Sequence, residues 1–341
     1  MAHTDTTPPP DVAAPRAALA RRATGAAGAA AGPAKGAYRK VSAGRYRFIR
    51  AYWTTFRVIA SYLWLSFKAR LWGKSYKERH LADVHKRNAK RVESTILVLQ
   101  GLFIKVGQLL SILANFLPEE FRSELEGLQD QVPPRPYAEI ALRIESDLGR
   151  KVSECYAEFD EEPIASASLG QVHRAVTRDG VVVAVKVQHH DIDRIVRLDL
   201  VTIRRILRII QWFVPIQGLD GYYHQIKDLL RHELDFEREA ESVERIAKNF
   251  ERDPRVRFPT PIRALSTKRV LTSTFVEGYK VADVGRMAAL GIDRKDLANR
   301  LVRAYCQMIF IDGVYHADPH PGNLMFDAQG NLILLDFGAV A

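Results

Sequence analysis

Residues 315–324 read YHADPHPGNL, and residues 334–338 read LLDFG. The two segments carry Asp318, Asn323 and Asp336 in this order. An Asp, Asn, Asp series suits metal-assisted phosphoryl transfer, because one carboxylate orients or deprotonates the acceptor while an amide oxygen and a second carboxylate hold Mg²⁺ across the phosphates. DFG alone is a weak signal, and HADPHPGN alone also reads as an ordinary Pro-Gly turn. In this order, and behind the strand described next, they predict a nucleotide site.

Lys186 stands upstream in an apolar run, VVVAVKV (181–187), that is typical of an interior strand. Its ammonium is costly there unless it meets an anion, although a lysine at a strand end can also extend to water. Partners are available in HELDFEREA (232–240), which carries Glu233, Asp235, Glu237 and Glu239. Such a charge-rich helix is also typical of a solvated face. The downstream Asp, Asn, Asp series favours an ion-paired lysine at a functional site.

Upstream of the strand that carries Lys186 lies a loop of small residues, IASASLGQVH (164–173), in the place of a glycine-rich phosphate loop. Only Gly170 remains of the expected glycines, and each alanine Cβ restricts the backbone and crowds the approach to phosphate. Serine hydroxyls and backbone N–H groups can still form part of an anion site. The predicted nucleotide contacts are Ala165, Ser166, Ala167, Ser168, Gly170 and Lys186.

Two cysteines, Cys155 and Cys306, are too few for a metal cluster or a disulfide framework, so they favour a reducing, cytoplasmic setting. His316 and His320 have the spacing of a helical zinc pair, but the neighbouring prolines disfavour a helix. We therefore interpret both histidines as loop scaffolding.

The 341 residues carry a net charge of +10, which favours anionic partners without choosing among them. The net charge is the only feature that supports a nucleic-acid role, so no nucleic-acid partner is expected. No secretory signal is visible at the N-terminus, and the apolar run 58–67 is too short to span a bilayer.

Composition and periodicity divide the chain into five parts. Residues 1–36 are rich in Ala, Pro and Gly and predict a disordered tail. Residues 37–75 predict a basic, aromatic amphipathic helix, which either packs on the following domain or lies at a membrane surface. Residues 76–150 predict further helices, 151–278 a mostly β region with helical inserts, and 279–341 helices leading to the last strand.

The individual elements follow from the same patterns. Helices are expected over 38–73, 76–116, 119–128, 137–148, 191–213, 222–250, 281–290 and 296–311. Strands are expected in 155–176, 181–187, 262–265, 270–275 and 331–338.

Four motifs in order resemble those of the UbiB/AarF-type atypical kinases. FIKVGQLLS (103–111) resembles the KxGQ helix motif of this family, ELDFEREA (233–240) its ExD motif, and IASASLGQVH its alanine-rich loop. HADPHPGN and LLDFG resemble its catalytic and metal loops, and the resemblance covers residues 76–341. It implies an α+β, protein-kinase-like bilobal fold with an N-terminal helical extension. Because the chain ends at Ala341, an incomplete C-lobe is expected, without a C-terminal membrane-spanning pair and with apolar surface left exposed.

The resemblance also implies the cofactors ATP and Mg²⁺ and roles for individual residues. Lys186 would contact the phosphates and pair with Glu239, and Asp318 would be the catalytic aspartate. Asn323 and Asp336 would be the magnesium ligands. Ala317 stands where protein kinases carry arginine, so control by a phosphorylated activation loop is not expected.

The KxGQ helix is implied to have a regulatory, occluding role. Lys105 and Gln108 share one helix face, and Gly107 permits a close backbone approach. The alternative is a packed helix with a surface lysine. The resemblance places this helix across the peptide site of a protein kinase, with Lys105 meeting Glu233 of the ExD motif, which also contains Asp235.

The implied function is an ATP- and Mg²⁺-dependent kinase or ATPase that supports isoprenoid-quinone (ubiquinone) or lipid metabolism, peripherally on the inner face of a membrane. Its partners would include a lipid or quinone-precursor ligand and other proteins of quinone biosynthesis. Two alternatives stay open: a small-molecule phosphotransferase, and an inactive nucleotide- or lipid-binding scaffold.

Overall fold

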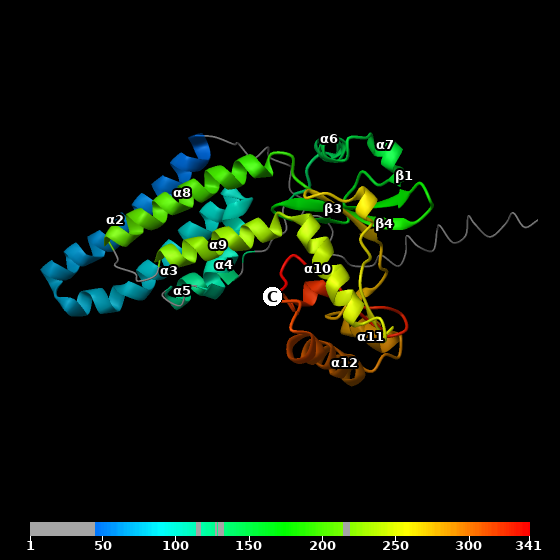
Figure 1. Cartoon of the computed structure of the whole chain (residues 1–341). Helices are drawn as coiled ribbons and strands as arrows, with labels where there is room; N and C mark the ends of the chain where they lie inside the picture. Colours follow the sequence, from blue (N-terminus) through cyan, green and yellow to red (C-terminus); the bar gives the residue numbers. More distant parts are fainter. Residues whose placement is uncertain (1–44, 114–116, 127, 129–132, 214–218) are drawn as a thin grey trace, which may run out of the picture.

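The computed structural model describes residues 45–113, 117–126, 128, 133–213 and 219–341. Figure 1 shows a group of long helices on one side, a sheet with short helices beside it, and a second lobe that contains the C-terminus. The first 36 residues, for which a disordered tail was predicted, lie outside the described part. The two sheets and the segregated helices confirm the α+β class.

The helical extension combines helices that precede the first sheet in the sequence with two helices that are inserted between strands of that sheet. It contains α2 (Arg45–Trp72), α3 (Lys74–Leu99), α4 (Leu102–Leu113), α5 (Glu119–Glu126), α8 (Ile192–Phe213) and α9 (Leu219–Glu233). The helices α2 and α3 form an antiparallel hairpin around Gly73, whose φ of 86° suits glycine. Buried side chains of α3, α4, α5, α8 and α9 share one apolar core.

Two of the predicted helices are each split in the structure. The helix expected over 76–116 breaks between α3 and α4, where Gln100 and Gly101 have φ values of 52° and 58° that no helix can contain. The helix expected over 222–250 breaks between α9 and α10 (Phe236–Asn249). There the carboxylate of Asp235 caps α10 by accepting from the Arg238 N–H at 3.3 Å. Apolar periodicity continues through both breaks and hides them.

The first sheet has the order β1-β3-β4-β6, with β2 paired to β3. Its strands are β1 (Tyr156–Phe159), β2 (Ala165–Ser166), β3 (Gly170–Thr177), β4 (Val182–Gln188) and β6 (Val270–Thr274), all antiparallel to their neighbours. Val183, Val185 and Val187 are fully buried and pack with α6 (Tyr137–Leu148) and α7 (Val152–Cys155). Side chains alternate along a strand, so Lys186 lies on the opposite face.

The strand expected over 262–265 is wrong, because Arg263–Leu265 forms a turn of 3₁₀-helix. The Ser266 hydroxyl donates to the Ile262 carbonyl at 2.9 Å and closes this turn. Ser, Thr and Asn side chains compete with strand pairing in this way.

The second sheet has the order β5-β9-β8-β7 and positions the two loops at the end of the sequence. It consists of β5 (Val256–Arg257), β7 (Tyr279–Lys280), β8 (Leu324–Phe326) and β9 (Leu332–Leu334). The final strand is shorter than predicted and ends before Asp336, whose φ of 58° cannot continue a strand.

Helices α11 (Val284–Ala289) and α12 (Arg294–Cys306) complete this lobe, and α12 continues into a π-helical turn, Gln307–Asp312. Phe310 and Ile311 on that turn are 80% and 79% exposed. Across the described residues, no helix combines the length and apolar character needed to cross a membrane.

Candidate functional site

Lys186 forms the centre of an ion network between the two sheets. Its Nζ lies 2.9 Å and 2.8 Å from the two carboxylate oxygens of Glu239 and 3.3 Å from Asp336 Oδ1. The three residues come from β4, from α10 and from the segment after β9. The ammonium also lies 5.0 Å from the ring centre of Phe236, the first residue of α10. The ion pair that the resemblance implies between Lys186 and Glu239 is therefore present.

Burial and opposite charges together set the ionisation of this network. Burial raises the pKa of Glu239 to about 7, against the opposing effect of Lys186. Burial also disfavours the charged lysine, but Asp336 and Glu239 outweigh it and raise the pKa of Lys186. The Lys186 ammonium in turn lowers the pKa of Asp336. At neutral pH the network therefore holds a charged lysine and an ionised Asp336.

Asp318 and Asn323 lie together on the polar loop between the π-helical turn and β8. The Asn323 side chain donates from Nδ2 to Asp318 Oδ2 at 2.9 Å. Its backbone carbonyl accepts from the N–H of Leu335 at 2.9 Å, so Asn323 lies beside the residue that precedes Asp336. Because the amide nitrogen is used by Asp318, the amide oxygen is the atom that remains to bind a cation.

The donor set fits Mg²⁺. Magnesium is usually bound through one or two carboxylates together with substrate phosphates and water, rather than by a cage of protein ligands. Asp336 and the amide oxygen of Asn323 provide such a partial set. The described ranges contain no group of three or more His, Cys, Asp or Glu side chains that could hold a metal ion by itself.

His316 fixes the backbone at Asp336, a role that the sequence did not reveal beyond loop scaffolding. The ring is fully buried, and Nε2 donates to the carbonyls of Leu335 and Asp336, each at 2.9 Å. It also meets the Phe337 ring edge to face, with centroids 4.9 Å apart. A left-handed conformation at a non-glycine residue costs about 1–3 kcal/mol, so such contacts are needed to hold Asp336 in place. His320 only accepts from the Gly322 N–H.

The alanine-rich loop is a tight hairpin on the face of the sheet that carries Lys186. Ala165 pairs with Val172, and Val172 pairs with Lys186, so these three residues form a row across β2, β3 and β4. The Ala167 N–H donates to the Gly170 carbonyl at 2.8 Å and closes the loop. This register brings the loop to the same face as the predicted phosphate-binding lysine.

The interior of the loop differs from its rim. Ser168 is only 4% exposed, so its hydroxyl lies inside the loop, while Ala165 is exposed. The Leu169 side chain joins the apolar core of the helical extension. A Cβ on Gly170 would lie 2.5 Å from the Val187 carbonyl oxygen, so glycine is required there for packing. The loop is thus fixed to the helices through Leu169 and to the sheet through Gly170.

The KxGQ helix, α4, lies near the ion network around Lys186. Lys105 Nζ lies 2.7 Å from Glu233 Oε1 at the end of α9, as the resemblance implies. The charge of Lys105 also contributes, after Lys186, to the lowered pKa of Asp336. Gln108 donates to the Leu128 carbonyl at 2.9 Å, and a Cβ on Gly107 would lie 2.5 Å from the Leu128 side chain. The helix is held by α5 on one side and α9 on the other.

Of the predicted site residues, one group meets directly and the others surround it. Lys186, Glu239 and Asp336 are in contact, and Asp318 and Asn323 form a second pair, which is linked by a backbone hydrogen bond to Leu335, the residue before Asp336. Asp235 serves as a helix cap, so it acts on the network by placing α10.

Comparison with known proteins identifies the same family of atypical kinases as the sequence motifs do. A family model described as the ABC1 atypical kinase-like domain matches residues 127–341. AarF domain-containing protein kinase 1 of Gallus gallus is 36% identical over 75% of this chain and 50% of its own length. The protein ACTIVITY OF BC1 COMPLEX KINASE 7, chloroplastic, of Arabidopsis thaliana is 38% identical over 77% of this chain and 38% of its own length.

A solved structure is similar to this one as well. The complex of Rv3197 with erythromycin from Mycobacterium tuberculosis has a TM-score of 0.53 and 31% sequence identity, over 78% of this chain and 67% of that chain. The chain spans about half or less of the length of the two curated relatives above.

Proposed function

The chain belongs to the ABC1 atypical kinase-like family, and on this premise we propose that it binds ATP with Mg²⁺ and transfers or releases the terminal phosphoryl group. The contact of Lys186 with both Glu239 and Asp336 carries the proposal. Phosphoryl transfer depends mainly on positioning and on neutralising charge at the phosphates, which an oriented ammonium and a carboxylate–amide pair can provide.

Each residue has a distinct task in this proposal. Glu239 aims the Lys186 ammonium at the phosphates, and phosphate oxygens would replace Asp336 as its second anionic partner. Asp336 and Asn323 would hold Mg²⁺, which supplies charge neutralisation at the transferring phosphoryl group. Asp318, tied to Asn323 at 2.9 Å, would orient the attacking hydroxyl or water and accept its proton.

The test is ATP turnover in Asp336→Asn, with exposed Asp228→Asn on α9 as the matched control. The substitution keeps the shape of the side chain but removes the charge, so we expect turnover to fall by about 10²-fold or more while nucleotide still binds. The control should behave like the native protein. Undiminished turnover in Asp336→Asn would refute the proposed role, and nucleotide binding without turnover in the native chain would favour the scaffold alternative.

The acceptor in this proposal is a small or lipid-like molecule of isoprenoid-quinone or lipid metabolism rather than a protein. The support is α4, which is fixed beside the ion network by the Lys105–Glu233 pair and the Gln108 hydrogen bond. A helix in this position would obstruct an extended peptide. Efficient phosphorylation of generic peptides by the native protein would contradict this assignment, and turnover that rises only with soluble alcohols would favour the small-molecule phosphotransferase alternative.

We further propose peripheral binding to a membrane through α2. One side of this helix packs on α3 and α8, with Ala51 and Leu65 buried. The other side exposes large aromatic residues next to Arg and Lys side chains, among them Trp53, Phe56, Trp64 and Phe67. Aromatic rings and basic groups are the combination that binds the interface of an anionic bilayer.

Flotation with anionic vesicles tests this contact. Deleting the whole helix would remove buried core, so the better change is the double substitution Trp64→Ser/Phe67→Ser, which should reduce the bound fraction several-fold. The control is Phe310→Ser/Ile311→Ser, which removes exposed apolar surface from the other lobe. Equal losses in both double variants would point to non-specific adsorption and overturn the contact through α2.

A further inference from the structure

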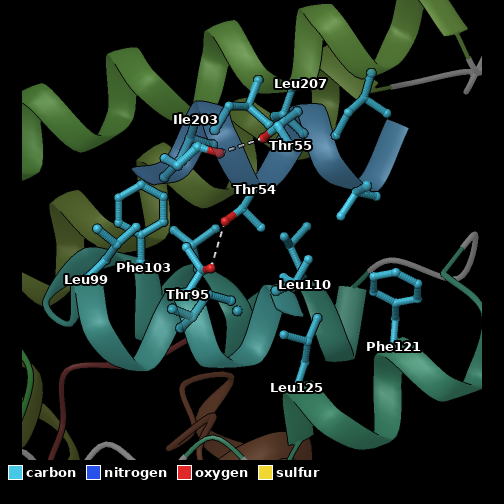
Figure 2. A pocket seen from close by; sticks show the side chains of 18 of the residues that line it. Thr54, Thr55, Thr95, Leu99, Phe103, Leu110, Phe121, Leu125, Ile203 and Leu207 are labelled. Atoms are coloured by element: carbon cyan, nitrogen blue, oxygen red, sulfur yellow. Dashed lines mark hydrogen bonds between the residues drawn. The ribbon is translucent and has the colours of Figure 1, made fainter. Parts of the chain in front are cut away.

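The helical extension contains a hollow that the proposed nucleotide site does not use. Its volume is about 240 Å³, and it lies between α2, α3, α4, α5 and α8. Figure 2 shows side chains from these helices converging on it, among them Leu99, Phe103, Leu110, Phe121, Leu125 and Leu207. The hollow is therefore a feature of this helical group, and its lining residues do not belong to the loops that carry Asp318 and Asp336.

The side chains that line the hollow are almost entirely hydrocarbon. Every lining residue is apolar, glycine or threonine, and no charged side chain contributes to the wall. The threonine hydroxyls already have partners: Thr54 and Thr95 bond each other at 2.8 Å, and Thr55 donates to the Ala51 carbonyl at 3.0 Å. A ligand with polar groups inside the hollow would lose its hydrogen bonds to water without replacement.

The size of the hollow argues against a simple packing defect. Protein interiors are close-packed, and voids much larger than a water molecule are few. An engineered apolar cavity of about 150 Å³, lined by the same kinds of side chain, stays dry and binds benzene. The hollow here is larger, so an apolar ligand would restore contacts that the surrounding helices otherwise lack.

Two features indicate which apolar ligand. Residues 1–44 of this chain have few large apolar side chains and are poorly suited to fill the space. In contrast, Trp53 and Phe56 are exposed on α2 immediately beside Thr54 and Thr55, which line the hollow. The same turns of α2 thus present aromatic side chains that suit a bilayer on the outer face and form one wall of the apolar hollow on the inner face.

We propose that this hollow binds the hydrocarbon chain of a membrane lipid. Binding here requires no nucleotide and no residue of the ion network, so the site is additional to the proposed phosphoryl-transfer site. The head group would stay outside, because the walls contain no group that could recognise it.

The first test is a fluorescence titration with cis-parinaric acid, an unsaturated fatty acid, in the absence of nucleotide. Val92→Phe fills the hollow from α3, and Val98→Phe adds the same bulk to an exposed position of the same helix. We expect saturable binding to the native chain, a Kd at least tenfold higher for Val92→Phe, and a Kd within about twofold of native for Val98→Phe. Equal affinity in Val92→Phe and the native chain would overturn the proposal.

The second test uses the native chain, so it does not depend on how the variants fold. Anionic phosphatidylcholine–phosphatidylglycerol vesicles containing a phosphatidylcholine with a diazirine at the end of its acyl chain are irradiated with the protein. Labelling of lining residues such as Phe103 or Leu207 supports the proposal. Labelling confined to the outer face of α2, at Trp53 or Trp64, would show surface adsorption only and would overturn it.

Discussion

Gly170 is the position where the alanine-rich loop depends most on side-chain size. The neighbouring positions accept alanine because they lie at the hairpin rim or turn, whereas a Cβ at 170 meets the backbone of β4. The one glycine retained in this loop is thus required by strand packing. At the positions that carry alanine instead of glycine, there is room for a Cβ on the side of the proposed nucleotide site.

We predict that Gly170→Ala destabilises the protein by about 1–3 kcal/mol and weakens ATP binding, since Val187 or the loop must move. Urea unfolding and ATP titration measure the two effects. The control is Gly221→Ala on α9, where a Cβ would meet nothing within 4 Å. A Gly170→Ala protein with native stability and ATP affinity would show that the loop has more room than the structure indicates.

The converse change addresses the alanines themselves. Ala165→Gly or Ala167→Gly frees the backbone and removes a Cβ near the row that ends at Lys186. We predict a changed affinity or selectivity between ATP and ADP, measured by titration calorimetry. Unchanged binding of both nucleotides in both variants would mean that this loop does not cover the phosphates.

His189 links this loop to acid stability. Its Nε2 donates to the Ala167 carbonyl at 3.2 Å, and burial, followed by the charge of Arg135, lowers the pKa of the ring to about 3. The unfolded chain takes up this proton near pH 6.5 while the folded protein does not. Stability is therefore lost as pH falls from about 6.5 towards 3, by about 1.4 kcal/mol per pH unit for this group.

We predict that His189→Asn flattens the decline of unfolding free energy between about pH 6 and pH 4 by roughly this slope. Buried His173, whose pKa is also lowered by burial, leaves a residual slope in the variant. His224→Asn on the surface of α9 is the control. Parallel stability–pH curves for His189→Asn and the native chain would contradict the buried, neutral state of this ring.

Among the helices, α2 is held by one buried ion pair. Arg47 Nη2 lies 2.5 Å from Asp199 Oδ2 on α8, and Arg47 Nη1 donates to the Leu99 carbonyl at the end of α3. Both side chains are nearly inaccessible to water. Burial raises the pKa of Asp199 to about 6, although Arg47 acts in the opposite direction. One guanidinium therefore joins three helices around the hollow.

We predict that Arg47→Met lowers the unfolding free energy by about 3–5 kcal/mol, because it leaves Asp199 buried without a partner. The double variant Arg47→Met/Asp199→Leu should recover much of that loss. Arg57→Met, on the exposed side of the same helix, should change stability by less than about 0.5 kcal/mol. A single variant no more destabilising than this control would show that the pair contributes little.

The sequence predicted most elements but not where they break. The periods of α6 and β4 were clear because their apolar positions face one core, as Ile140 and Val185 do. The breaks at Gln100 and Asp235 were missed because apolar residues continue on both sides, and a backbone with positive φ or a capping carboxylate leaves little trace in periodicity. The short strands of the second lobe depend on long-range pairing that local pattern does not report.

At the level of the whole molecule, the site exists only because distant segments meet. Lys186 and Asp336 are 150 positions apart, and their contact requires both sheets to be placed by α10 and the helical extension. Motif order indicated this meeting through family resemblance. The roles of His316 and Leu169 could not be read from the sequence, because a buried ring that bonds two carbonyls and a loop side chain inserted between helices have no local signature.

Nucleotide binding tests the proposed site more directly than catalytic activity does. The chain covers only part of the length of its relatives, whereas the ion network and the Asp318–Asn323 pair are formed within residues 186–336. The proposed binding of ATP therefore rests on contacts that this chain contains.

The decisive measurement is calorimetric titration of the native chain and Lys186→Ala with ATP, with and without Mg²⁺. Exposed Lys280→Ala on β7 is the control. We predict saturable binding that requires Mg²⁺ for full affinity, is weakened at least about tenfold by Lys186→Ala, and is unaffected by the control. Binding of equal strength in Lys186→Ala, or no saturable binding to the native chain, would contradict a nucleotide site centred on Lys186.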